Sequence, residues 1–418
     1  MSEPRHRRSR SSGGRRRRVA IQDHPPSVRE LDRAARRTEA GRRRRRLLLA
    51  AGAALVMVGA AVGGSWLLFS DRPQASDQVV RAGEEGASLL VVITGEDGRA
   101  RSLTLVVAHP EAAGRVVLFP PGLIALLPGY DERPIADAPN FGAQPPLLGS
   151  AELAGLTIMN LLGVRVDAVT LLGVADLEGL LPARLTVDLP VALQVEQDGG
   201  EVVAVTAGSA QHPPAMVGRL LASQGTGDQL AWLERQGAVW EALLNRVATD
   251  PGLVAGLTAA DWGDPTDARA ALTGAGEDPD LVLTALQVSR VAVAGPDPAE
   301  YYTLASRAVS DFVAVQVPFL RLGEEQRTRV EILNGNGRIG TTQPVAELLI
   351  GRGFRVIRTD NADRSDYETT QVIAQGLKHQ QAAIDIRRLL ATGEVLAEQR
   401  QPSTVVDVTI ILGEDAPT

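Results

Sequence analysis

Three glycines in the last quarter of the chain form the pattern with the clearest chemistry. Gly335, Gly337 and Gly340 spell G-x-G-x-x-G between a predicted strand and a predicted helix, and Asp360 falls 20 residues after the last of them. Dinucleotide-binding folds use such a turn to hold a pyrophosphate at a helix start, with a carboxylate further along the chain for the ribose. The spacing therefore makes a nucleotide site one interpretation of this segment.

Two other interpretations suit the rest of the chain better. Only 78 residues follow Gly340, too few for a complete doubly wound domain, and the preceding part supplies no second half. We favour a structural role, in which the glycines provide positive φ in a strand-to-helix turn. The functional alternative is that the backbone amides of Asn334, Gly335, Gly337 and Gly340 hold an anionic glycan or a carboxylate.

The residues around this turn predict a small α/β module that holds it. Strands are predicted at TRVEIL, FRVIRT, TQVIA and VVDVTIIL, and helices at Val345–Leu349 and Ala382–Leu390. The segments V-E-I-L-N-G-N-G-R-I-G, G-F-R-V and D-V-T-I-I-L-G, with Tyr367 and Thr370, resemble the LytR C-terminal domain over residues 327–415. The resemblance implies an envelope-facing binding or accessory role.

The preceding part of the chain predicts a larger domain over residues 88–320. Short apolar runs at Leu89–Thr94, Leu103–Ala108 and Arg115–Phe119 predict strands that are buried on both faces. A helix is predicted to end at Gly163, and the glycine turn after Gln197 predicts a hairpin. Because strands alternate with helices, we expect an α/β (α+β) sandwich, with residues 321–326 as a hinge before the last module.

This larger domain resembles the LytR-CpsA-Psr family. The resemblance is carried by the order of the elements and by NLLGVRVDAVTLLGVADLEGLL (Asn160–Leu181) and LERQGAVWEAL (Leu233–Leu243). It implies a membrane-anchored protein that faces outward. Active members of that family move glycopolymers from a polyprenyl-pyrophosphate carrier onto peptidoglycan.

The family's charged motifs are incomplete in this chain. Its R-S-D-T segment reads Arg101-Ser102-Leu103-Thr104, so a leucine replaces the aspartate that helps to hold a divalent cation. Its P-R-D segment corresponds to Pro120-Pro121-Gly122, and its later paired arginines fall near Ala222 and Gln224. In its D-x-x-R-x-x-R-Q helix, Asp228, Arg235 and Gln236 persist, whereas Trp232 takes the place of the inner arginine.

These replacements matter because a pyrophosphate needs arginines and a metal ion to offset its charge. A leucine offers Mg²⁺ no oxygen ligand. We therefore predict a catalytically degenerate domain, with Asp97, Arg101, Asp228 and Arg235 as candidate remnants of the pocket, or alternatively as solvated surface residues. We expect no cofactor, except that an active domain would need Mg²⁺. Five scattered histidines and no cysteine argue against a metal site.

An apolar run near the N-terminus predicts how the protein is placed in the cell. Leu47–Phe69 is 23 residues long and uncharged, follows the arginines Arg42–Arg46 and precedes a linker at residues 70–87. A helix of that length is predicted to span a membrane. The arginines place the N-terminus in the cytoplasm and the domains after Ser70 outside the cell, where nicotinamide cofactors are scarce.

The predicted cytoplasmic tail, residues 1–46, contains 17 Arg and 5 acidic residues, whereas the whole chain has a net charge of -7. Its composition predicts disorder and attraction to anionic lipid. We expect no nucleic acid as a partner, because no recognition element accompanies the arginines.

Together these features predict a single-pass protein of cell-wall biogenesis. It would bind or scaffold a lipid-linked glycopolymer or peptidoglycan without catalysing its transfer. Two alternatives remain open, namely an active phosphotransferase and a transcriptional regulator that acts through the arginine-rich tail.

Overall fold

A computed structural model of the chain describes residues 86–141, 148–197, 199–291, 300–324, 326–397 and 405–417. The chain divides into two compact units, Met1–Ser76 and Asp77–Thr418, and all described residues belong to the second. The predicted membrane segment Leu47–Phe69 lies outside the described residues. Among the residues that are described, none of the helices is both long and apolar enough to cross a bilayer.

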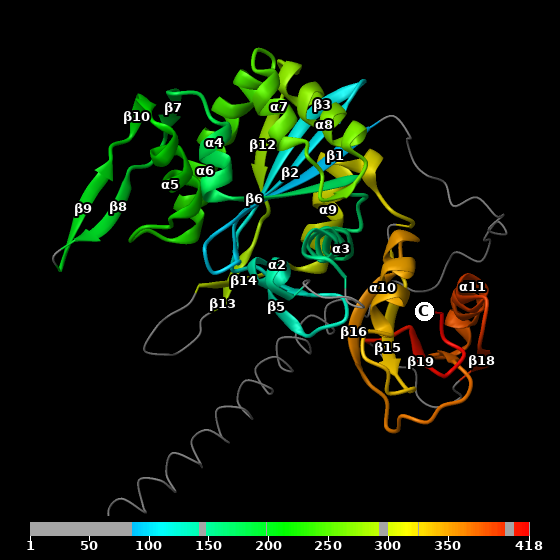
Figure 1. The fold of residues 1–418 in the computed structure, drawn as a ribbon. Coiled ribbons are helices and arrows are strands. Elements are labelled where there is room, and N and C mark those ends of the chain that lie inside the picture. Colours follow the sequence, from blue (N-terminus) through cyan, green and yellow to red (C-terminus); the bar gives the residue numbers. More distant parts are fainter. Residues whose placement is uncertain are drawn as a thin grey trace, which may run out of the picture. The chain divides into compact units, whose positions relative to one another are not determined.

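A six-stranded mixed sheet forms the centre of the larger domain (Figure 1). Its order is β11 (Trp262–Gly263), β6 (Ala168–Gly173), β1 (Ala87–Thr94), β2 (Ala100–His109), β3 (Ala112–Phe119) and β12 (Val282–Ala285). The antiparallel strands β1, β2 and β3 correspond to the three predicted apolar runs. They are central because both faces of each strand are apolar and must be covered.

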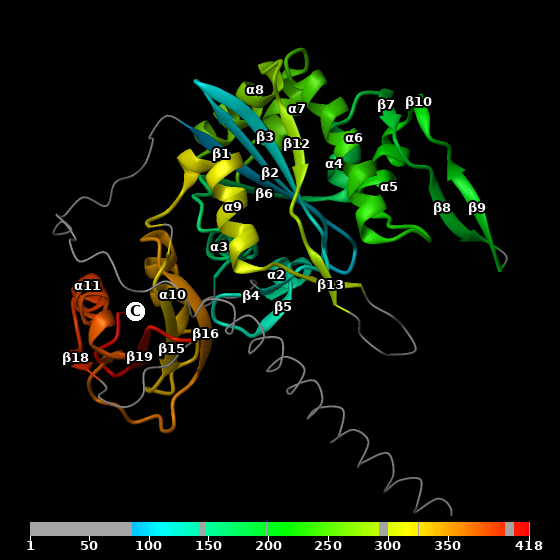
Figure 2. The ribbon, with the colours of Figure 1, turned by 180° about the vertical axis from the view of Figure 1, so that it is seen from behind.

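Helices cover both faces of this sheet (Figures 1 and 2). On one face, Leu90 and Val92 of β1 pack in the same core as α3 (Ser150–Leu162). On the other, Leu89 and Val91 share a core with α6 (Gln229–Val247) and α8 (Pro265–Glu277). Helix α3 ends at Gly163, whose φ is 73°, as the sequence predicts. The mixed α/β class is confirmed.

Shorter elements surround this centre. They are β4 (Ile124–Leu126), β5 (Glu132–Pro134), α2 (Ala138–Phe141), α4 (Val174–Leu180), β7 (Leu185–Leu189), β8 (Leu193–Gln197), β9 (Gly200–Val205), β10 (Gly208–His212), α5 (Pro214–Ala222), α7 (Pro251–Leu257), β13 (Ser289–Val291), β14 (Tyr301–Thr303) and α9 (Ser306–Gln316). Strands β8 and β9 form the predicted hairpin.

The C-terminal module, which we define as residues 327–415, contains a five-stranded sheet. Its order is β16 (Arg355–Asn361), β15 (Arg329–Asn334), β19 (Val408–Leu412), β17 (Gln371–Ala374) and β18 (Glu394–Ala397). Helices α10 (Thr342–Gly351) and α11 (Gln380–Leu390) pack on the sheet, and the core includes Ile332, Val345, Ile386 and Ile410. Each predicted strand and helix of the module is present, and β18 is an addition. The last strand, β19, lies parallel to β15, which places the turn after β15 beside the end of β19.

Candidate functional site

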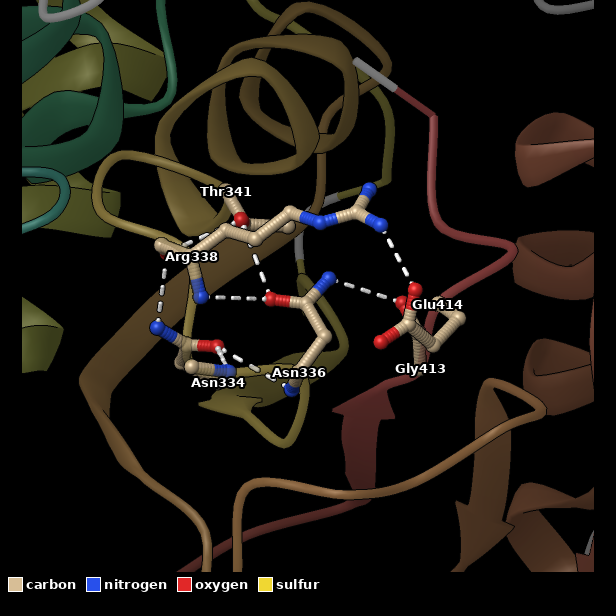
Figure 3. Close-up of polar contacts among 7 residues, drawn as sticks. Asn334, Asn336, Arg338, Thr341, Gly413 and Glu414 are labelled. Atoms are coloured by element: carbon tan, nitrogen blue, oxygen red, sulfur yellow. Dashed lines mark hydrogen bonds and ion pairs between the residues drawn. The ribbon is translucent and has the colours of Figure 1, made fainter.

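The turn between β15 and α10 is held together by its own asparagine side chains (Figure 3). Asn334 donates a hydrogen bond from its side-chain amide to the carbonyl of Arg338, at 2.9 Å. Its side-chain oxygen accepts from the backbone amides of Asn336, at 3.3 Å, and Gly337, at 3.0 Å. The amide of Gly337, one of the candidates for anion binding, therefore already has an acceptor within the turn, and the candidate amide of Gly335 donates to the carbonyl of Leu412 at 3.0 Å.

Asn336 joins this turn to the segment after β19. Its side chain is buried, and its oxygen accepts from the backbone amide of Arg338 at 3.0 Å and from the Thr341 hydroxyl at 3.3 Å. Its amide group donates to the carbonyl of Gly413 at 2.8 Å. Asn336 was not among the predicted site residues, although the repeated Asn-Gly pair was a signal for side chains that bond to a turn.

The three glycines of the turn are required for two different reasons. Gly337 and Gly340 have φ values of 70° and 82°, which L-residues with a side chain rarely adopt. Gly335 lies so close to its neighbours that a Cβ atom would come 2.8 Å from the Tyr367 ring and from the carbonyl oxygen of Leu412. Positive φ therefore explains two of the three glycines, and close packing explains the third.

The outer surface of the turn presents a charged pair and an apolar side chain. Arg338 forms an ion pair with Glu414 at 2.6 Å, and both side chains are about half exposed. Ile339 is 82% exposed. Asp360, the residue at the ribose position of the dinucleotide pattern, accepts from the guanidinium of Arg358 at 2.6 Å, and this bond lowers the pKa of its carboxyl.

A polar hollow lies next to the turn, and Tyr367, which lines it, is bonded both to the turn and to the segment after β19. The Tyr367 amide donates to the carbonyl of Gly335, and its carbonyl accepts from the amide of Glu414, each at 2.9 Å. The guanidinium of Arg364 covers the Tyr367 ring at 4.2 Å. The hollow is lined by Arg364, Asp366, Tyr367, Glu368, Thr369, Gln371 and Glu394. Charged and amide groups therefore dominate the surface that a ligand would meet there.

In the larger domain, Asp97 and Arg101 lie side by side at the start of β2. Their side chains form an ion pair at 2.9 Å, and both are partly exposed. The adjacent Arg99 is paired with Asp137 at 2.7 Å. The structure thus brings two of the four candidate pocket residues together, with their charges directed at each other.

The other two candidates, Asp228 and Arg235, belong to α6 and bond to the chain itself. Asp228 is the N-cap of this helix, because its carboxylate accepts from the amide of Ala231 at 2.8 Å. Arg235 is 1% exposed and donates to the carbonyls of Gln224, at 2.6 Å, and Ala192, at 3.3 Å. Burial lowers the pKa of its guanidinium. Arg235 therefore holds two loops against the helix.

The residues beside Arg235 continue this internal network. Gln236 is buried, accepts from the Ser102 hydroxyl at 3.2 Å, and donates to the carbonyls of Arg101 and Leu221, each at 2.9 Å. The Trp232 indole is also buried and donates to the carbonyl of Leu221 at 3.0 Å. At Trp232, where the resembling family has an arginine, the helix therefore has a buried indole.

Glu300 is the centre of a cluster that the sequence did not predict. Its carboxylate accepts from the backbone amide of Gln229 at 2.8 Å and from the Gln224 side chain at 3.2 Å, and it pairs with Arg290 at 2.7 Å. The Gln229 side chain in turn accepts from the amide of Gly122 at 2.9 Å.

Tyr302 completes the cluster, with its hydroxyl 3.4 Å from the Glu300 carboxylate. Burial, together with the negative charge of Glu300, raises the pKa of Tyr302 to about 12. The donors of this region therefore surround a carboxylate of the chain. Among the described residues, no three His, Cys, Asp or Glu side chains are grouped so that they could hold a metal ion.

The comparison with known sequence families finds a match for the C-terminal module. Residues 327–415 match the sequence family described as LytR cell envelope-related transcriptional attenuator. No relative among curated proteins matches the chain in sequence.

Solved structures with a similar fold include TagV of B. subtilis, at 15% identity over 56% of this chain and 97% of that chain, with a TM-score of 0.44. A transcriptional regulator from Enterococcus faecalis has 18% identity over 58% of this chain and 90% of its own, with a TM-score of 0.44. The LytR-CPS2A-psr family protein TagT, with bound octaprenyl pyrophosphate lipid, has 14% identity over 60% of this chain and 99% of that chain, with a TM-score of 0.42. The expected LytR C-terminal domain is confirmed by the match of residues 327–415 to the family described as LytR cell envelope-related transcriptional attenuator.

Proposed function

We propose that this protein acts in cell-wall biogenesis and that its larger domain binds a lipid-linked wall glycopolymer without transferring it. The observation that carries the absence of transfer is the Glu300 cluster. In the resembling family, the segment at Pro120–Gly122 and the start of the α6 helix supply charges for a diphosphate. Here the Gln229 amide and Arg290 are bonded to the Glu300 carboxylate, and the Gly122 amide is bonded to the side chain of Gln229.

Electrostatics explain why such an arrangement disfavours transfer. Two unit charges of like sign 4 Å apart repel by about 4 kcal/mol at an effective dielectric constant of 20. A diphosphate at this position would meet the carboxylate of Glu300, which is 11% exposed at its side chain. Leu103, at the position of the metal-binding aspartate, is buried in the sheet and offers no oxygen ligand. The charge of a phosphoryl-transfer transition state would thus remain uncompensated.

The class of ligand is suggested by the proteins with a similar fold. TagT has been solved with octaprenyl pyrophosphate lipid and with LIIa-WTA and LI-WTA bound. By resemblance, we propose that this chain meets a lipid-linked glycopolymer or peptidoglycan at the outer surface of the cytoplasmic membrane. Its anchor would be the apolar segment Leu47–Phe69, with the N-terminal tail in the cytoplasm against anionic lipid.

A binding and turnover assay on the full-length chain in lipid nanodiscs tests this function. We expect saturable binding of a polyprenyl-pyrophosphate-linked glycan, with no release of polyprenyl phosphate when Mg²⁺ is added. Glu300→Gln removes the central charge and should tighten binding, whereas Glu111→Gln, on an exposed turn, should leave it unchanged. Mg²⁺-dependent release that is lost in Asp97→Asn or Arg101→Gln would establish the active phosphotransferase instead.

The third possibility, a transcriptional regulator, depends on the arginine-rich tail at residues 1–46, which lies outside the described residues. It requires DNA binding that weakens steeply with salt concentration and disappears when the tail arginines are replaced by glutamine. Binding of the nanodisc-embedded protein to DNA that survives these replacements would exclude the tail as its cause.

A further inference from the structure

The outer edge of β16 is paired with a side chain of α3. The amide of Val356 donates to the side-chain oxygen of Asn160 at 3.0 Å, and the side-chain nitrogen of Asn160 donates to the carbonyl of Val356 at 2.8 Å. Two directly opposite residues of antiparallel strands exchange the same pair of N–H···O hydrogen bonds. One asparagine therefore takes the place of a neighbouring strand at the edge of the module's sheet.

Asn160 is 4% exposed and stands in an apolar helical sequence, TIMNLL. A buried side-chain amide must find hydrogen-bond partners within the protein. Both of its polar atoms are satisfied by Val356, which is 196 residues away in the chain. The presence of an asparagine in this apolar helix is thus explained by the C-terminal module.

Two further bonds flank this pair. The buried side chain of Gln343, in the first turn of α10, accepts from the amide of Leu148 at 3.1 Å. The hydroxyl of Thr359, on β16, donates to the carbonyl of Tyr130 at 2.9 Å. Apolar residues of α3 and of the module also share one buried cluster, which includes Leu156, Met159, Val330 and Val356.

The segment that connects the two parts is bonded to the same helix. Arg327 donates to the last carbonyls of α3, at 2.9 Å for Asn160 and 3.4 Å for Leu161. Burial, together with the charge of Arg355, lowers the pKa of Arg327 to about 10. No carboxylate in the described part of the chain forms an ion pair with Arg327, so the negative end of the helix dipole provides its compensation.

The residues predicted as a hinge are also held in place. The amide of Leu322 donates to the carbonyl of Gly163 at 2.8 Å, and the amide of Arg165 donates to the carbonyl of Leu320 at 2.7 Å. Gly323 lies against Gly353 so closely that a Cβ atom on it would be 3.2 Å from the Cα atom of Gly353. The connecting segment is therefore bonded to the larger domain at Gly163 and packed against the module at Gly353.

From these contacts we infer that the C-terminal end of α3 is a docking surface whose partner is the chain's own C-terminal module. Asn160 is its central residue, and both parts lie within the compact unit Asp77–Thr418. The module is a fixed extension of the larger domain, and Asn160 occupies the backbone groups of Val356 at the outer edge of β16.

Hydrogen–deuterium exchange on the full-length protein tests this docking. Asn160→Ala removes both bonds to Val356 and should raise exchange at residues 354–361 and 342–349 at least tenfold, while residues 89–107 stay protected. Asn361→Ala, an exposed asparagine at the end of β16, is the matched control and should change neither region. Equal protection of residues 354–361 in Asn160→Ala and the unmodified protein would overturn the inference.

A milder variant decides the matter if Asn160→Ala loses protection throughout the chain. Thr359→Val preserves the side-chain shape and removes only the bond to Tyr130. Increased exchange confined to residues 354–361, with new tryptic cleavage at Arg321 or Arg327, would support docking. Unchanged exchange and unchanged resistance to trypsin would refute it. Neither result depends on glycopolymer binding, so the proposed function can fail while the docking holds.

Discussion

Asn336 is the residue on which the geometry of the C-terminal turn depends most. It accepts two hydrogen bonds from inside the turn and donates one to Gly413, beyond the last strand. Because its partners are separated by more than 70 residues in sequence, this side chain ties the two ends of the module together. Arg338 and Glu414 connect the same two segments, but their charges are exposed to water.

We expect Asn336→Ala to lower the free energy of unfolding of the module by about 1–3 kcal/mol, because it leaves the buried carbonyl of Gly413 unpaired. Arg338→Gln, which breaks the exposed ion pair between the same segments, should cost at most about 1 kcal/mol. Urea unfolding of both variants measures the difference. Equal losses would show that the asparagine has no special role.

Asp407 leads to a prediction about pH. It accepts from the backbone amide, Nε and Nη2 of Arg329 at 2.8, 3.0 and 2.7 Å, and His379 lies 3.1 Å away. Burial alone would raise the pKa of Asp407, but the bonds from Arg329 outweigh it, so that the pKa is lowered from 3.8. The folded state therefore holds this proton less tightly than the unfolded state does.

The stability that Asp407 contributes is consequently complete above about pH 4 and decreases as the pH falls below 3.8. Asp407→Asn should cost about 1.5–3 kcal/mol near pH 7, because it weakens the charge-assisted hydrogen bonds that Arg329 donates to the carboxylate. This difference from the unmodified protein should shrink between pH 4 and pH 2.5 in urea titrations. A difference that stays constant over that range would contradict the assignment.

At the scale of single elements, turn glycines and helix starts decide where the chain changes direction. The glycines of the β15–α10 turn have a direct test. Gly337→Ala should destabilise the module by about 1 kcal/mol or more, because φ is positive there. Gly351→Ala, at the end of α10, has open space around its Cβ position and should stabilise the helix by about 0.5–1 kcal/mol. Thermal unfolding would distinguish the two signs.

Helix α6 supplies a prediction about the missing arginine of the larger domain. Trp232 is buried and its indole bonds to the carbonyl of Leu221, so Trp232→Arg should destabilise the domain by about 3–5 kcal/mol and not restore phosphate binding. Leu230→Arg, on the exposed side of the same helix, should have little effect. A stable Trp232→Arg protein with Mg²⁺-dependent turnover would show that one residue separates this chain from an active enzyme.

For the whole molecule, the uneven distribution of charge and the apolar segment together predict its topology. The chain has no cysteine, so single cysteines can be introduced as clean labels. Ser209→Cys, at an exposed position of β10, should react with a membrane-impermeant maleimide in intact cells, whereas Ser11→Cys in the tail should react only after the cells are opened. The opposite labelling pattern would place the two folded parts in the cytoplasm.

Local patterns in the sequence predicted the three central strands of the larger domain and every strand and α-helix of the module except β18. Continuous apolar runs predicted β1, β2 and β3, because a strand covered on both faces has few polar residues. Helices α7 and α8 were missed, since residues 250–280 are rich in small and polar residues. Their starts were nevertheless visible as Asp-Pro pairs, in which Asp250 and Asp264 cap the helices that begin at Pro251 and Pro265.

Local residue patterns were enough to predict the three central strands, the glycine turn and the module of residues 327–415, because these depend on neighbours within a few turns of the chain. The packing of distant segments is what makes Arg235 bond to carbonyls, gathers donors around Glu300 and lets Asn160 complete the edge of a distant sheet. The identity of a charged or amide residue does not tell whether its side chain faces a ligand, the solvent or a backbone group. Which of these it meets depends on packing between segments as far apart as 229 residues, and no local spacing records that.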